Sequence, residues 1–183
     1  MKKIWNGNRN RILAVCVGVV LFALFFRYVK VPTGFPEVSI QTAYGIGAFF
    51  AALLGSVGGA FVAFVGHTLS DVIQFGPPCW SWVIASGVAM YITGLSSSKI
   101  KIHKGEFTIK DVIVFNIYQV VGNLLAWCLI APGLDVLMYG ENALYAFEQG
   151  VWATLPNMVS AGVIGSVLLG MYSRIQAQKK IEC

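Results

Sequence analysis

The stretch AYGIGAFFAALLGSVGGAFVAFVGHTLSDVI, residues 43–73, decides the fold because it is long, apolar and carries a single charged residue, Asp71. A helix needs about 20 apolar residues to cross the hydrocarbon core of a membrane, so this stretch is too long for one ordinary span. The glycines within residues 55–59 favour a break in its middle. The stretch therefore predicts two short helices, over residues 43–54 and 57–73.

Further apolar runs on both sides of this stretch extend the pattern along the chain. The composition agrees, since 57% of the residues are hydrophobic and 11% are charged, against about 25% charged residues in a soluble domain. We therefore expect an all-α integral membrane protein, a six-transmembrane-helix bundle that forms one membrane domain over residues 1–183. The six expected helices span residues 12–29, 43–54, 57–73, 82–97, 110–132 and 150–173.

Positive charges predict how the chain is oriented in the membrane. Apart from Arg27 and Lys30, the Lys and Arg residues form three clusters: Lys2, Lys3, Arg9 and Arg11; Lys99, Lys101, Lys104 and Lys110; Arg174, Lys179 and Lys180. Because Lys and Arg are retained on the cytoplasmic side, we expect a multi-pass protein of the cell membrane with both termini in the cytoplasm. Residues 99–110 would then be cytoplasmic and residues 133–149 external. The charges flank apolar spans instead of forming a basic face, so a nucleic-acid partner is not expected.

Two ionisable residues lie inside the third expected helix. His67 and Asp71 are four residues apart and so share one face of that helix. Polar groups inside membrane spans are costly unless they are paired or face a cavity. The pair either locks helix packing or contacts a ligand near the external end of the helix.

A second polar set consists of side-chain amides. Asn116, Gln119 and Asn123 form one stripe of the fifth expected helix, and Asn157 follows Pro156 in the sixth. Amides both donate and accept hydrogen bonds, which suits either contacts between helices or the edge of a bound heterocycle. Both interpretations remain open for all four residues.

Aromatic and small residues give two further indications. Tyr44, Trp80 and Trp82 lie at the expected external ends of helices, where they form either an aromatic belt or a stacking surface for a planar ligand. Ala14 and Gly18 form a small-xxx-small pair on the first helix, which permits close packing inside the subunit or against a partner.

The sequence carries no motif of an enzyme. It lacks the phosphate-binding loop of nucleotide hydrolases, the HExxH zinc motif and the GxSxG nucleophile motif. Its four cysteines are too scattered to form a metal-ligand pattern. We therefore expect no cofactor and no metal. An intramembrane enzyme that uses His67 and Asp71 as an acid/base pair is a rival interpretation, but it lacks a nucleophile.

Several motifs together resemble a known family. The residues that carry the resemblance are Ser39-Ile40-Gln41 with Tyr44, Gly66-His67 with Asp71, Trp80-Ser81-Trp82, Phe115-Asn116 with Gln119 and Asn123, and Asn157 with Ser160. Over residues 12–172 the chain resembles the substrate-binding S components of energy-coupling factor (ECF) transporters, specifically the riboflavin type. The resemblance implies a subunit that captures a vitamin at the external face of the membrane. It also implies assembly with a transmembrane T subunit and two ABC ATPases.

On this interpretation we expect the following roles for the residues named above. Tyr44, Trp80 and Trp82 would stack on the ligand, and the polar side chains of Asn116, Gln119, Asn123 and Asn157 would bind its ring edge. His67 and Asp71 would contact the ligand or fix the helix end, and Gln41 lies on a loop placed to act as a lid. Ala14 and Gly18 would contact the T subunit.

Riboflavin is the favoured ligand. The alternatives are hydroxymethylpyrimidine or thiamine, pyridoxine, and cobalamin. A self-sufficient small transporter is the rival class of protein.

Overall fold

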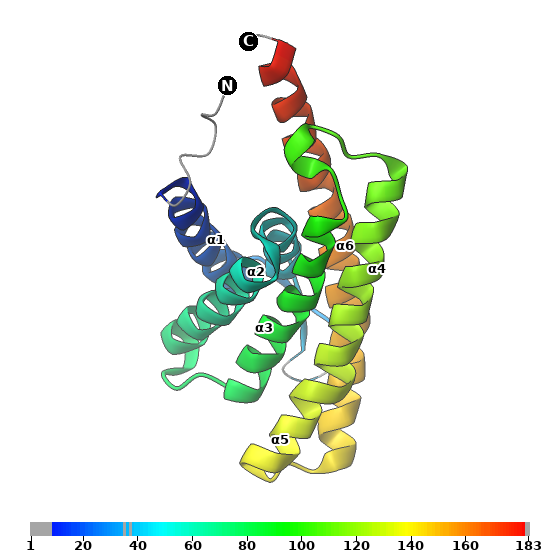
Figure 1. Ribbon diagram of the computed structural model, residues 1–183. Helices are drawn as coiled ribbons and strands as arrows, with labels where there is room; N and C mark the ends of the chain where they lie inside the picture. The colour runs from blue at the N-terminus through cyan, green and yellow to red at the C-terminus, as the bar shows by residue number, and fades with distance from the viewer. Residues whose placement is uncertain (1–8, 35, 37, 182–183) are drawn as a thin grey trace.

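The structure is a computed structural model that describes residues 9–34, 36 and 38–181, and these residues form mainly helices (Figure 1). The helices are α1 (Arg9–Tyr28), α2 (Ala43–Phe75), α3 (Trp80–Gly94), α4 (Ile109–Leu125), α5 (Ala131–Tyr139) and α6 (Ala143–Ile181). A short antiparallel hairpin, β1 (Lys30–Pro32) and β2 (Ser39–Gln41), connects α1 to α2. Two 3-10 turns, Leu95–Ser98 and Ile102–Lys104, connect α3 to α4.

The long apolar stretch forms one kinked helix. Gly55 is the only residue inside α2 with non-helical dihedral angles, φ 80° and ψ 179°. This region of the dihedral map is accessible essentially to glycine alone, which explains why the break falls there. The two expected helices are therefore two limbs of α2, and the expected count of six separate helices is not confirmed.

Helix also continues beyond the expected ends of the last two spans. A π-helical turn, Ala126–Ile130, joins α4 to α5, so that helix runs on to Tyr139. Helix α6 begins at Ala143 and accommodates Pro156 in its interior. Most of the segment over residues 133–149, which we expect outside the membrane, is therefore helical.

Within the described residues, four helical stretches are long and apolar enough to cross a membrane: Arg9–Tyr28, Ala43–Phe75, Ile109–Tyr139 and Ala143–Lys180. Helix α3 has 15 residues and is shorter than these. Helix α2 lies at the centre of the bundle, between α1, α3 and α6 (Figure 1). Its buried Tyr44 packs against the rings of Phe22 and Trp127, at centroid distances of 5.7 and 5.1 Å.

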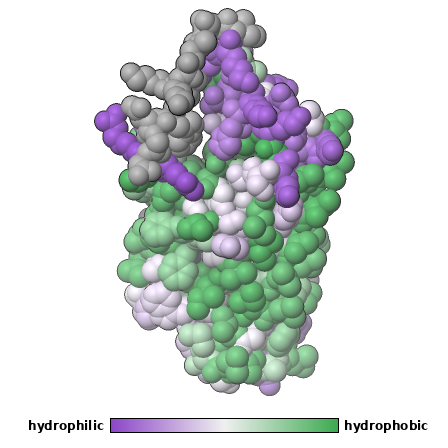
Figure 2. Space-filling model, viewed as in Figure 1, coloured by the Kyte–Doolittle hydropathy of each residue, from purple (hydrophilic) through white to green (hydrophobic). Residues whose placement is uncertain are grey.

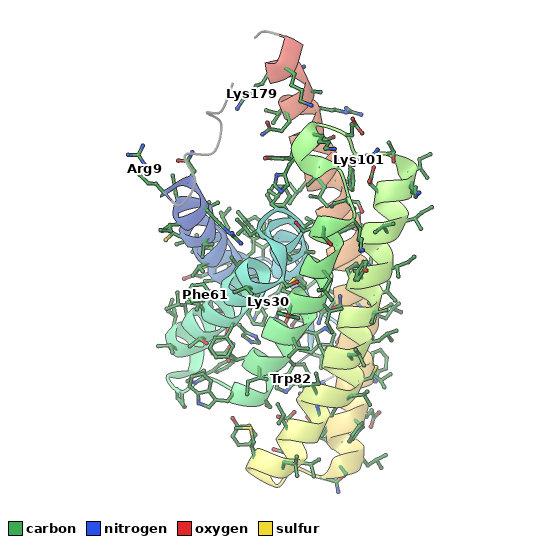
Figure 3. The ribbon with its side chains drawn as sticks, in the orientation of Figure 1. Arg9, Lys30, Phe61, Trp82, Lys101 and Lys179 are labelled. Atoms are coloured by element: carbon green, nitrogen blue, oxygen red, sulfur yellow. The ribbon has the colours of Figure 1, made fainter. Side chains whose placement is uncertain are left out.

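The basic clusters gather at one end of the molecule. Arg9, Lys101 and Lys179, one from each cluster, lie at the same end in Figure 3. Hydrophilic surface gathers at that end in Figure 2, and the surface below it is largely hydrophobic. The turn between α5 and α6 lies at the opposite end. Lys2 and Lys3 lie outside the described residues.

The small-residue pair of α1 faces the interior of the subunit. Gly18 is buried, and a Cβ atom there would lie 3.0 Å from Phe50 and from Val62 of α2. Ala14 is half-buried and packs against the same core. Gly18 therefore packs against α2 within the subunit, and its contact with a T subunit stays a prediction.

Candidate functional site

A cavity of about 480 Å³ lies between the hairpin, α2, α3 and α6. Trp82, one of its lining residues, lies in the half of the molecule away from the basic clusters (Figure 3). Six of the expected site residues line it: Gln41, Tyr44, His67, Asp71, Trp82 and Asn157. Its size is within the range of about 300–1,000 Å³ that is usual for small-molecule sites.

One wall of the cavity is a chain of hydrogen bonds between buried polar side chains. The Ser86 hydroxyl lies 3.0 Å from the Tyr44 hydroxyl and 2.7 Å from Nδ1 of His67. Nε2 of His67 lies 3.5 Å from Oδ1 of Asp71. The other Asp71 oxygen accepts a hydrogen bond of 3.0 Å from the backbone N–H of Cys79. His67 and Asp71 thus link α2 to the start of α3 and also line the cavity.

The assignment of donors and acceptors along these hydrogen bonds shows what the wall offers to a ligand. The Ser86 hydroxyl donates to the Trp82 carbonyl, at 2.9 Å, because a carbonyl can only accept. Ser86 therefore accepts from Tyr44 and from Nδ1–H of His67. Nε2 of His67 then faces Oδ1 of Asp71, with the two atoms 3.5 Å apart. The Asp71 carboxylate is an acceptor in this wall and suits a donor on the ligand, such as a ring N–H or a hydroxyl.

Two indole rings form an aromatic side of the site. Trp82 stacks on the buried Trp127, with ring centroids 5.5 Å apart and an interplanar angle of 25°. The Trp82 indole N–H donates to Asp135 over 2.8 Å, and the Ser81 hydroxyl donates to the other oxygen of the same carboxylate. The hydrogen bond to Asp135 of α5 and the stacking on Trp127 of the π turn therefore fix the orientation of Trp82. Its ring is thus held in place for stacking on a planar ligand.

The amide stripe lies behind this aromatic side. Gln119 donates to Asn116, Asn123 donates to Gln119, and the Trp127 indole donates to Asn123, at 3.1, 3.1 and 2.8 Å. Asn116 also donates to Ser166 of α6 at 3.1 Å. None of the three amides is among the residues that line the cavity. Their hydrogen bonds hold Trp127 in place and join α4 to α6.

The hairpin is attached to α6 at the cavity. The backbone N–H of Gln41 donates to Asn157 over 3.4 Å, and its carbonyl accepts from Ser160 over 2.8 Å. The side-chain oxygen of Gln41 is buried without a hydrogen-bond partner. A buried acceptor without a partner is costly. Gln41 lines the cavity, so a ligand with a donor group would relieve this cost.

Trp80 is the expected stacking residue that lies away from the cavity. The residue is 41% exposed, its ring centroid lies 6.3 Å from that of Phe64, and its backbone N–H donates to the Tyr139 hydroxyl. It shares the start of α3 with Trp82, but successive residues of a helix point in different directions. Of the Trp-Ser-Trp motif, Trp82 alone lines the cavity.

Sequence reasoning missed five polar residues of the cavity: Lys30, Ser39, Gln74, Cys79 and Gln149. Helical spacing could have found two of them. Gln149 lies eight residues before Asn157, with Ala153 between them on the same face, and Gln74 lies seven residues after His67. Lys30 donates to Gln74 over 3.3 Å, and this pairing across the hairpin leaves no signal in the sequence.

Cys79 lies between α2 and α3, on the wall of the cavity. The residue is exposed overall, but desolvation of its thiol raises the pKa above the ordinary value, and a hydrogen bond with Ser81 opposes that rise. The thiol is therefore predominantly neutral at pH 7. Among the described residues, no group of His, Cys, Asp and Glu side chains could hold a metal ion.

Together these features describe a protein with several helices long and apolar enough to cross a membrane and a cavity lined by polar and aromatic side chains. The family model described as "ECF-type riboflavin transporter, S component" matches residues 7–174. Relatives named "UPF0397 protein" come from Enterococcus faecalis and Clostridium perfringens. Each is 40% identical to this chain over 168 residues, which cover 92% of the chain and 92% and 91% of the two relatives. A relative of the same name from Staphylococcus aureus is 38% identical over the same share of the chain.

The fold has a counterpart among solved structures. The S-component for biotin from an ECF-type ABC transporter matches with a TM-score of 0.59 and 13% identity, over 90% of this chain and 94% of the other. The chain belongs to the family of ECF-type riboflavin transporter S components. The resemblance seen in the sequence is thus confirmed, and the chain is a subunit of a transporter, not an enzyme.

Proposed function

We propose that the chain captures riboflavin in the cavity between the hairpin, α2, α3 and α6. The observation that carries this proposal is the unpaired, buried oxygen of Gln41 on the wall of a cavity that also presents the indole of Trp82. The flavin ring is planar and carries a ring N–H, and its side chain carries hydroxyl groups. It therefore combines a stacking surface with donors for Gln41 and Asp71.

The proposed contacts follow from the geometry of the wall. The ring would stack on Trp82, whose orientation Asp135 and Trp127 fix. Its N–H would donate to the acceptors at Gln41 or Asp71, and the hydroxyl chain would contact Asn157 and Gln149. Asn116, Gln119 and Asn123 would act indirectly, by holding Trp127.

A titration with a matched pair of variants tests this proposal. Riboflavin is titrated into purified protein while its fluorescence is followed, for the wild type, Trp82→Leu and Trp80→Leu. We expect the first variant to bind at least about tenfold more weakly, because loss of a stacking partner costs on the order of 1.4 kcal/mol. Trp80→Leu should bind as the wild type does, since Trp80 lies outside the cavity. Equal binding by both variants would contradict the proposed site.

Competition decides between riboflavin and the other vitamins. Hydroxymethylpyrimidine, thiamine, pyridoxine and cobalamin are each added to the riboflavin complex at a large excess. We expect none of them to displace riboflavin. If one of these vitamins displaces riboflavin at a concentration lower than the one riboflavin itself needs for binding, the cavity is assigned to that vitamin.

We further propose that the captured vitamin is transported only with a T subunit and two ABC ATPases. The sequence carries no nucleotide-binding motif, so we assign the energy source to the ATPase subunits. A vitamin-requiring strain should grow on low vitamin only when all the subunits are expressed together. Growth on this chain alone would instead support a self-sufficient transporter.

A further inference from the structure

A second cavity, of about 420 Å³, lies at the basic end of the molecule and plays no part in the proposed vitamin site. It lies between the start of α1, the kink of α2, the α3–α4 connection and the end of α6. Its cationic residues are Arg11, Lys179 and Lys180, and His103 lies beside them. Leu53, Leu54 and Tyr172 provide an apolar part of its lining. Basic side chains from both ends of the chain thus converge on one hollow.

The kink of α2 builds part of this cavity. The carbonyl of Leu54, just before Gly55, accepts a hydrogen bond of 2.9 Å from a guanidinium nitrogen of Arg11. The carbonyl of Leu53 lies 3.1 Å from Nε2 of His103, which must donate because a carbonyl can only accept. A guanidinium group has five N–H donors, so Arg11 keeps others for a ligand. These contacts fix Arg11 and His103 at the cavity.

The charges of the cavity are not balanced by the described part of the chain. No Asp or Glu is among the residues that line the cavity. Within the described residues, the ion pair at this end joins Lys101 to Glu106, at 3.7 Å, and none involves Arg11, Lys179 or Lys180. Lys180 does donate to the backbone carbonyl of Lys104, which leaves its positive charge uncompensated.

Apolar surface adjoins the charged hollow. Ile12 and Leu13 of α1 follow Arg11 directly and are each 62% exposed. Ile175 of α6, 49% exposed, lies one turn before Lys179. The cationic cavity thus lies where the apolar surface of the helices ends. This arrangement suits a phospholipid, whose anionic headgroup lies above its acyl chains.

We propose that this cavity binds a phosphate group, and that its source is the headgroup of an anionic phospholipid. Lys179, Lys180 and the free donors of Arg11 would contact the phosphate oxygens, since guanidinium and ammonium groups are the usual partners of phosphate. The acyl chains would lie along the exposed face of α1. Bound lipid would join the end of α6 to the start of α1.

The test compares two double variants that remove the same charge. Lys179→Gln/Lys180→Gln alters the cavity, and Lys99→Gln/Lys110→Gln removes two exposed lysines that do not line it. Each purified protein is titrated in detergent with phosphatidylglycerol or phosphatidylcholine, and retained lipid is measured by native mass spectrometry. We expect the cavity variant to bind phosphatidylglycerol about tenfold more weakly than the wild type does. The other variant should stay within about twofold of the wild type.

Two further measurements identify the source of the phosphate. Stabilisation of the wild type by glycerol 3-phosphate as large as that by phosphatidylglycerol would show that a soluble phosphate ester fills the site. An effect of the lipid alone would show that the headgroup does. Equal loss of lipid in both double variants, or equal affinity for phosphatidylcholine, would overturn the proposal. So would normal lipid binding by a cavity variant that fails to assemble with its partner subunits, because the cavity would then be a protein contact.

Discussion

At the scale of single residues, Gln41 carries an unsatisfied hydrogen-bond acceptor, because its side-chain oxygen is buried without a partner. Gln41→Met keeps the length of the side chain and removes this acceptor. We expect riboflavin to bind about tenfold more weakly, while the unliganded protein melts at the same or a higher temperature because a costly buried acceptor is gone. Titration and thermal unfolding measure both effects. Gln178→Met, at an exposed position of α6, is the control. Unchanged affinity in Gln41→Met would remove Gln41 from the site.

Cys79 reports on occupancy of the cavity. Because desolvation raises its thiol pKa, we expect slow alkylation by a maleimide at pH 7 and a rate that rises with pH through and beyond the ordinary thiol range. Riboflavin should slow the reaction further by covering the thiol. The assay uses protein in which Cys16, Cys128 and Cys183 are replaced by Ser, with Cys79→Ser as the blank. Fast alkylation at pH 7 that riboflavin does not change would contradict this environment.

The sequence could predict cavity residues where a rare residue type stood out in an apolar run. His67, Asp71 and Trp82 are such residues, and they line the cavity. The amides of α4 stood out equally, but a helical stripe does not reveal which neighbour it faces. In the structure Asn123 faces Trp127. Lys30 could not be predicted, because the hairpin that brings it to the cavity has only three residues in each strand.

At the scale of elements, the kink in α2 depends on one residue. The φ of Gly55, 80°, is strained for any residue with a side chain, although a Cβ atom would meet nothing within 4 Å. We expect Gly55→Ala to lower the free energy of unfolding by about 1–3 kcal/mol through backbone strain alone. Gly170→Ala in α6 also meets nothing within 4 Å, but has no positive φ, and should stabilise by about 0.5–1 kcal/mol. Opposite shifts in unfolding temperature support the kink, and equal shifts contradict it.

The contact between α1 and α2 gives a second prediction at this scale. Gly18→Leu would drive a side chain into Phe50 and Val62, and such overpacking costs about 1–3 kcal/mol. Val17→Leu, at a position that is 44% exposed, should leave stability unchanged. Thermal unfolding of the isolated subunit compares the two. A Gly18→Leu protein as stable as the wild type, but unable to assemble, would contradict the packing role and support the predicted docking role.

The apolar runs and the glycines of residues 55–59 predicted most of the helical architecture. They could not show that α2 continues through Gly55, since a kink and a break leave the same pattern of residues. Nor could composition show that α4 passes through a π turn into α5. That continuation depends on packing against α3 and α6, which only the folded chain defines.

At the scale of the whole molecule, we predict that the end with the basic clusters faces the cytoplasm and that the vitamin cavity faces outward. Lys104 and Glu141 are exposed and lie in the α3–α4 connection and the α5–α6 turn. In protein without native cysteines, Glu141→Cys should react with a membrane-impermeant thiol reagent in intact cells. Lys104→Cys should react only after the cells are opened. The reverse pattern would invert the molecule and place the cavity on the cytoplasmic side.

The orientation connects the two cavities to different surroundings. The vitamin cavity would meet the external medium, where a substrate must be captured, and the basic cavity would meet the anionic leaflet. Each cavity has its own residues, and none is shared. Loss of lipid binding should therefore leave riboflavin affinity in detergent unchanged.

The most direct test of the account is to identify the small molecule that co-purifies with the protein. The wild type and Trp82→Leu are purified from membranes of cells grown with riboflavin, and bound compounds are extracted and identified by absorbance and mass spectrometry. We predict that the wild type carries flavin in an amount close to that of the protein and that Trp82→Leu carries almost none. A wild type without flavin that also fails to bind added riboflavin, or flavin retained equally by Trp82→Leu, would contradict the account.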